Sequence, residues 1–94
     1  MYNSRMKAII TVVGEDKVGI IAGVSGALAQ RKVNILDITQ TILQNYFTMM
    51  MLVELSEMEL SLEKLKTALE EIGKQLGVSI RIQHEEIFRT MHRV

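Results

Sequence analysis

A short polar loop is the clearest candidate for binding chemistry. Residues 14–20 have the sequence Gly-Glu-Asp-Lys-Val-Gly-Ile, so the acidic–basic pair Asp16–Lys17 lies between two glycines just before a segment with helical spacing. Because the first N–H groups of a helix lack partners and the helix dipole favours negative charge there, such a turn can hold a carboxylate. A purely structural turn remains the alternative, in which Asp16 caps the helix and Gly14 relieves a tight bend.

We expect no metal centre, no cofactor and no catalytic site. The only group of metal-ligand residue types consists of His84, Glu85, Glu86 and His92. Their spacing matches no recognised ligand pattern and suits the polar start of a helix. No pair of residues has a spacing typical of a nucleophile and its base. The chain has no cysteine, which excludes thiolate metal sites and disulfides.

Composition limits the partners and the location. Eleven Lys and Arg residues balance eleven Asp and Glu residues, which removes the broad attraction that nucleic acids or anionic membranes require. No apolar run approaches the roughly 20 residues that cross a bilayer, and no signal peptide with a cleavage site is recognisable. A length of 94 residues predicts one domain, over 6–94, preceded by a start-site extension or disordered N-terminus over 1–5. The absence of cysteine and of a recognisable signal peptide favours a cytoplasmic location.

Hydrophobic periodicity predicts the element order β-α-β-β-α-β. Strands are expected over 7–13, 33–42, 46–55 and 78–83, and helices over 18–32 and 62–76. This order indicates an α+β fold, the ferredoxin-like sandwich, whose four-stranded antiparallel sheet carries both helices on one face. The first and third strands should be central. A short amphipathic helix is expected over 85–94.

Particular residues predict local details of these elements. Gly23 and Gly26 each cost a helix about 1 kcal/mol relative to alanine, so we expect the first helix to pack closely against the sheet. The strand over 33–42 alternates apolar and polar residues, which predicts a half-buried edge strand. Ser61 should cap the second helix, and Gly77 should end it.

Apolar residues on both faces of the central strands predict self-association. In the third strand, Met49 and Met51 lie on one side and Met50 and Leu52 on the other, and Ile9 repeats the pattern in the first strand. Since monomers rarely expose large apolar patches, we expect a homo-oligomer, in the simplest case a dimer. A second copy would cover the sheet or continue it edge to edge. The alternative is a sheet covered by the chain's own C-terminal helix.

The stretch ITVVGEDKVGIIAGVSGALAQRKVNILDITQTI resembles the ACT domain, a small ligand-binding regulatory module with the same element order. The resemblance rests on the Gly-x-Asp-Lys-x-Gly-Ile turn over 14–20, the helix that follows and the Val33-Asn34-Ile35 entry to the second strand. From Met6 onward the chain is similar to stand-alone ACT proteins of bacteria and archaea. It is also similar to ACT domains of the glycine-cleavage-regulator type.

The resemblance implies a ligand site between two subunits. In ACT domains that bind amino acids, the ligand is held by the turn after the first strand and the start of a neighbour's second strand. By this resemblance, Asp16 and Asn34 contact the amino and carboxylate groups. Gly19 and Ile20 offer backbone groups, and Gly14 permits a close approach.

Two positions depart from the family pattern, and a third residue, Asn34, has a structural alternative to ligand binding. Val18 replaces the proline that is common in ligand-binding members, and Asp16 replaces the neutral amide of some binders. A carboxylate at residue 16 would repel an acidic ligand and favour an amine. Asn34 would equally suit a turn between helix and strand.

Two functions remain open. The first is a homodimeric amino-acid sensor that acts on a regulated protein partner. The second is a ligand-free assembly or protein-interaction module that uses the same ACT surface. The difference lies in whether a small molecule binds at the turn over 14–20.

Overall fold

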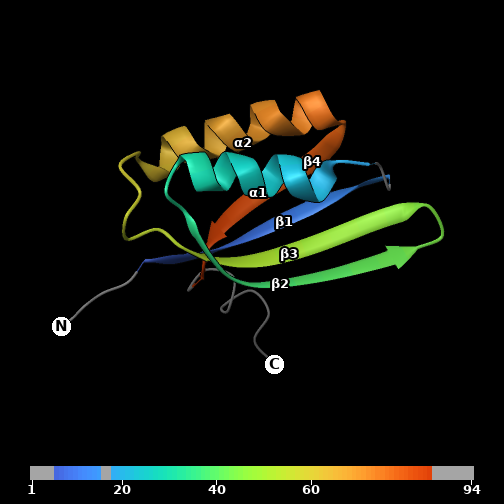
Figure 1. The fold of residues 1–94 in the computed structure, drawn as a ribbon, viewed down its shortest axis with the longest axis horizontal. Helices are drawn as coiled ribbons and strands as arrows, with labels where there is room; N and C mark the ends of the chain where they lie inside the picture. The colour runs from blue at the N-terminus through green and yellow to red at the C-terminus, as the bar shows by residue number, and fades with distance from the viewer. Residues whose placement is uncertain (1–5, 16–17, 86–94) are drawn as a thin grey trace.

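The chain folds into a four-stranded antiparallel sheet with two helices over one face (Figure 1). The computed structural model describes residues 6–15 and 18–85. The elements follow the predicted order: β1 (Lys7–Glu15), α1 (Ile20–Gln30), β2 (Asn34–Leu43), β3 (Tyr46–Glu54), α2 (Leu62–Leu76) and β4 (Val78–His84). The helix expected over 85–94 lies outside the described residues except for Glu85.

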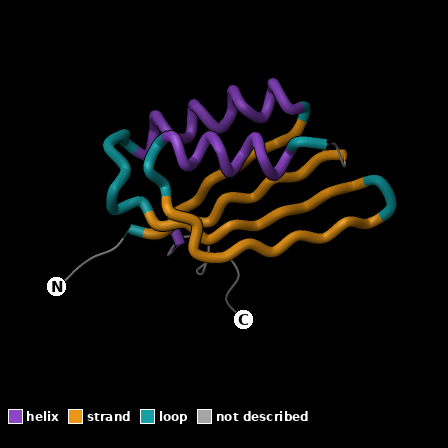
Figure 2. Tube along the Cα trace, viewed as in Figure 1, coloured by secondary structure: helices purple, strands orange, loops and turns teal. Residues whose placement is uncertain are grey.

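The strand order β2-β3-β1-β4 confirms the ferredoxin-like sandwich (Figure 2). The two central strands are β1 and β3, as the continuous apolar pattern predicts, and β2 and β4 are the edges. At one end of the sheet Gly14 lies opposite Phe47, and at the other end Lys7 lies opposite Glu54. Among the described helices, none has the length and apolar content that a membrane crossing needs.

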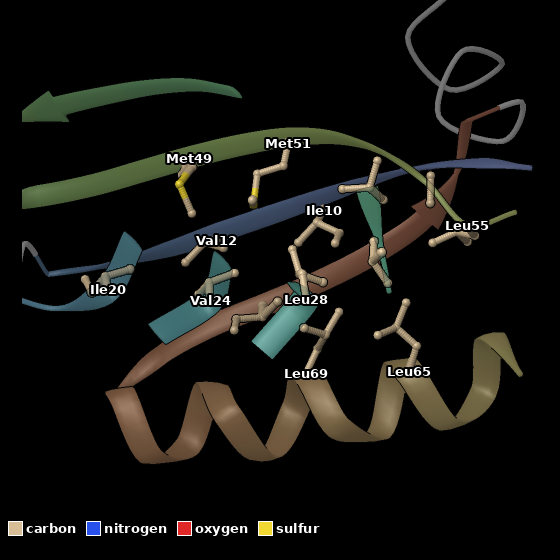
Figure 3. Packing of buried hydrophobic residues seen from close by; sticks show 14 of the residues in the cluster. Ile10, Val12, Ile20, Val24, Leu28, Met49, Met51, Leu55, Leu65 and Leu69 are labelled. Atoms are coloured by element: carbon tan, nitrogen blue, oxygen red, sulfur yellow. The ribbon is translucent and has the colours of Figure 1, made fainter. Parts of the chain in front are cut away.

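The core lies between the sheet and the two helices (Figure 3). Every second residue of β1 and β3 points toward the helices, and these side chains are almost fully buried. They pack with apolar residues of the helices, including Val24 and Leu28 of α1 and Leu65 and Leu69 of α2. Because burying one such side chain contributes about 1.5–3 kcal/mol, this layer holds the helices to the sheet.

The edge strand β2 is far more exposed than its alternating pattern predicts. All of its residues are exposed except Ile35, which is half-buried. A β-bulge between Ile35 and Asp37 interrupts the alternation. The β2–β3 hairpin also extends beyond the end of α1, so neither α1 nor α2 covers its far part (Figure 1). The prediction of a half-buried strand was therefore wrong.

The ends of α2 are as predicted. The hydroxyl Oγ of Ser61 accepts a hydrogen bond from the backbone N–H of Lys64 at 3.2 Å. Gly77 follows the helix with a φ of 74°, a conformation that strongly favours glycine.

The glycines of α1 do not pack against the sheet, contrary to the prediction. A Cβ on Gly23 would lie 3.1 Å from Cδ1 of Leu76, so Gly23 brings α1 close to α2. A Cβ on Gly26 would meet nothing within 4 Å. The close contact is therefore between α1 and α2 rather than between α1 and the sheet. Of the two glycines, only Gly23 takes part in it.

Candidate functional site

Gly14 has a packing role at the end of β1. A Cβ on Gly14 would lie 2.7 Å from Cγ1 of Val78 in the neighbouring strand β4. Real Cβ atoms do not approach other atoms so closely, so glycine lets β4 pair tightly with β1 at this end of the sheet. The requirement for glycine here therefore has a source within the fold, whatever else approaches the turn.

The start of α1 carries no side-chain cap among the residues that the structure describes. Gly19 is the N-cap residue with a φ of 92°, and no described side chain forms a capping hydrogen bond. Within residues 6–15 and 18–85, no atom lies within 4 Å of the position of a Cβ on Gly19, and Val18 is fully exposed. Helix N–H groups at such an end favour an anionic ligand group. Asp16 and Lys17, the charged pair of the predicted site, lie outside the described residues.

Ile20 can offer only its backbone to a ligand. Its side chain is 2% exposed and belongs to the core cluster under α1. The backbone contact to a ligand that the resemblance implies for Ile20 stays a prediction. The same burial fixes the first turn of α1 against the sheet, because an apolar side chain there anchors the helix start.

Asn34 begins β2 at the other end of the sheet, where its side chain is exposed. It borders a pocket of about 390 Å³ lined by Lys32, Val33, Asn34, Glu54, Ser56 and Glu57. Sheet pairing places Asn34 opposite Glu54. Sequence reasoning missed the pocket because β-strand register, rather than proximity in the chain, assembles it.

One chain does not bring the predicted site residues together. Gly14 lies opposite Phe47, whereas Asn34 lies opposite Glu54. Because a strand rises about 3.3 Å per residue, the seven-residue offset between Phe47 and Glu54 amounts to about 23 Å. A free amino acid is far shorter than this distance. The turn and Asn34 can contact the same ligand only if they come from different chains.

The β2–β3 hairpin carries exposed apolar side chains on both of its faces, and we call this set the hairpin patch. Ile38 and Ile42 pair with Met51 and Phe47 of the helix-facing side, whereas Leu43 pairs with Tyr46 on the other side. Its large apolar residues are all exposed: Leu36, Ile38, Ile42, Leu43 and Tyr46. The most exposed is Leu43 at 72%. Sequence reasoning missed this patch because the alternating pattern suggested that half of β2 would be buried.

The described residues show no group of three or more His, Cys, Asp or Glu side chains arranged to hold a metal ion. Of the group considered from the sequence, His84 and Glu85 are described, and both are half-buried. Glu86 and His92 lie outside the described residues.

Comparisons of the sequence and of the structure with known proteins agree on one family. The ACT domain family matches residues 7–83. A UPF0237 protein of Clostridium acetobutylicum is 66% identical over 89 residues, which cover 95% of this chain and 100% of that protein. An ACT domain protein from Streptococcus pneumoniae has 50% identity and a TM-score of 0.80, with 90% of this chain and 96% of that chain covered. A protein described as a glycine cleavage system transcriptional repressor has 26% identity and a TM-score of 0.75, with 87% and 47% covered.

Proposed function

The chain belongs to the ACT domain family, and from this premise we propose that it is a regulatory protein that binds a free amino acid at a homodimer interface. One observation carries the proposal. The open turn at Gly19 and the exposed Asn34 lie at opposite ends of the sheet, and the free edge strand β2 runs between these two ends. We further propose that the protein works in the cytoplasm.

Antiparallel pairing of two β2 strands would assemble the site. The start of each β2, with Asn34, would then lie beside the end of the partner's β2, with Leu43. Register places Leu43 opposite Tyr46, and Tyr46 opposite Glu15. Each Asn34 would thus reach the end of the sheet from which the partner's turn over 14–20 departs. A two-fold axis creates two equivalent sites.

The distances in such a dimer suit a small ligand. Adjacent strands lie about 4.8 Å apart, so three strand spacings separate Asn34 from the partner's β1 by about 14 Å. An amino acid together with two polar side chains can fill this gap. The helix N–H groups at Gly19 would receive the carboxylate, and the amide of Asn34 and the carboxylate of Asp16 would hold the remaining polar groups, including the amine.

The character of β2 supports its use as the interface. It is ten residues long and carries four of the exposed apolar side chains of the hairpin patch. A long exposed edge strand with apolar side chains is a ready template for pairing with another chain. Dimer formation would cover the unpaired edge and part of the patch together.

The hairpin patch also favours a second candidate function. A dimer built on apolar contacts alone needs no ligand, and the fully exposed Val18 beside the turn adds apolar surface for a protein partner. In that case the chain is an assembly or protein-interaction module. The two functions differ in their response to free amino acids.

Thermal unfolding in the presence of each common amino acid tests the proposal. Circular dichroism follows the transition, because the chain has no Trp. A ligand at 100 times its dissociation constant stabilises the folded state by about 2.7 kcal/mol per site, which shifts the midpoint by roughly 10–20 °C in a domain of this size. No shift with any amino acid would reject sensing and leave the assembly module.

Asn34→Ala then separates ligand binding from assembly. We expect this variant to lose most of the thermal shift and to keep the dimer in sedimentation velocity. Gln75→Ala is the matched control, since it removes an exposed amide from α2, a helix that contributes no residue to the proposed site. An equal loss in both variants would contradict a specific role for Asn34.

A further inference from the structure

A groove along the second edge of the sheet has no role in the proposed dimer. It lies between α2 and β4 and has a volume of about 750 Å³. Polar residues of both elements line it: Lys66, Glu70 and Lys74 from α2, and Ser79, Arg81 and Gln83 from β4. The dimer proposed above uses β2, so the groove stays open in that assembly.

The floor of the groove is the edge strand β4. Within the part of the chain that the structure describes, β4 pairs with another strand, β1, on one side only. Backbone N–H and C=O groups of alternate residues along its outer side therefore point away from the sheet. An extended peptide can add a strand to such an edge through main-chain hydrogen bonds, while pockets for alternate side chains provide specificity.

The charges along α2 match the repeat of an extended strand. Lys66, Glu70 and Lys74 follow one another at four-residue intervals on one face of the helix. The two lysines are about 12 Å apart along the axis, at 1.5 Å per residue. Residues i and i+4 of a strand are about 13 Å apart and point to the same side. Two carboxylates with that separation would meet both lysines.

The two lysines that α2 contributes to the groove are held weakly or not at all by the described residues. Within residues 6–15 and 18–85, Lys66 forms no salt bridge. Lys74 lies 3.7 Å from Glu71, with both side chains largely exposed, so this pair holds the ammonium group weakly. A partner with acidic groups is the electrostatic complement of such a surface.

We propose that the groove between α2 and β4 binds an extended acidic segment of another protein as a fifth strand, with carboxylates at positions i and i+4 facing Lys66 and Lys74. Glu70 lies between the two lysines and selects a basic or neutral residue at i+2. Arg81 points to the other side of the sheet, because it pairs with Thr11, and it receives a further carboxylate at i+1 or i+3.

A second copy of the chain is a poor occupant of this edge. The strand β4 contains no acidic residue. Symmetric antiparallel pairing of two β4 strands about their middle residue would place Arg81 opposite Arg81, and like charges directly opposite destabilise a pair of strands. The positive charge of Arg81, which disfavours pairing between two β4 strands, favours an acidic partner.

Binding of two designed peptides to the full chain tests the proposal. The probe is the fluorescein-labelled peptide Thr-Glu-Val-Lys-Val-Glu-Thr, and the control is Thr-Lys-Val-Glu-Val-Lys-Thr with reversed charges. Fluorescence anisotropy measures both affinities at low ionic strength. Because each exposed ion pair changes affinity up to about fivefold, we expect the probe to bind at least about tenfold more tightly than the control. Equal affinities would overturn the proposal.

Charge reversal on α2 locates the binding. Lys66→Glu with Lys74→Glu should weaken the probe about tenfold and reverse the preference between the two peptides. Lys32→Glu with Lys64→Glu changes the net charge by the same amount at two exposed lysines that line a different surface, and it should leave both affinities unchanged. Equal effects in the two proteins would mean that only overall charge matters, which contradicts the proposal.

Amide hydrogen exchange reports the strand addition itself. The probe should slow exchange at alternate residues of Val78–His84 and leave Asn34–Leu43 unchanged. Protection confined to β2 would overturn the proposal, since it would place the peptide on the opposite edge. This measurement needs no free amino acid, so its outcome is independent of the proposed sensing function.

Discussion

Gly14 and Asn34 lie at opposite ends of one sheet, separated by about 23 Å along β3. A site that uses the turn after β1 and the start of β2 must therefore draw on two chains. The free edge β2 connects the two ends, and its antiparallel pairing with a second copy is the simplest arrangement that brings them together. Dimer geometry and ligand binding are thus linked through one strand.

Charges on the hairpin patch should dissociate the dimer. Ile38 and Ile42 are 40% and 55% exposed, so replacing both with lysine costs the monomer fold little. In the dimer the new charges would lie beside the partner's edge strand and repel their equivalents. We expect Ile38→Lys with Ile42→Lys to sediment as a monomer and to lose the thermal response to amino acids.

Val13→Lys is the matched control for this experiment. Val13 is 44% exposed and lies on the face of the sheet opposite α1 and α2. An edge-to-edge dimer should tolerate the substitution. If Val13→Lys dissociates the dimer and the hairpin variant does not, the second copy covers the open face of the sheet.

Gly14→Ala should destabilise the fold through Val78. The new Cβ would lie 2.7 Å from Cγ1 of Val78, and overpacking of this kind costs about 1–3 kcal/mol. Val78→Ala removes the contacting methyl group and should restore much of the loss in the double variant. Urea denaturation of the four proteins gives the coupling energy. Full additivity would show that the two residues act independently.

Gly26→Ala should stabilise the protein, in contrast to Gly23→Ala. Gly26 is exposed within α1 and has no neighbour near its Cβ position, so alanine should add about 0.5–1 kcal/mol. At Gly23 the new Cβ would lie 3.1 Å from Leu76, which reduces or reverses the gain. Thermal unfolding of both variants checks this. Equal effects would contradict the assigned packing of α1 on α2.

Local signals were sufficient for the elements and placed their boundaries to within two residues. Ser61 and Gly77 delimit α2 through chemistry within a few residues, and continuous apolar runs distinguish the central strands from the edges. The bulge after Ile35 could not be predicted, because it depends on how β2 pairs with β3. The prediction assumed regular alternation of apolar and polar residues with no bulge, and this indicated a half-buried strand.

Contacts between distant segments could not be predicted in the same way. The approach of Gly14 to Val78 and that of Gly23 to Leu76 depend on how β4 and α2 pack in the finished fold. The residues around Asn34 come together only through sheet register. The separation of Asn34 from the turn over 14–20 likewise follows from topology, and it is this separation that calls for a second chain.

Complementation between two defective chains tests the shared site most directly. The amino acid with the largest thermal shift serves as ligand, and isothermal titration calorimetry measures its stoichiometry. Asp16→Ala and Asn34→Ala should each bind poorly alone. When the two are mixed and allowed to exchange subunits, each mixed dimer should regain one intact site from the turn of one chain and Asn34 of the other. No recovery after verified exchange would contradict a site built from two chains.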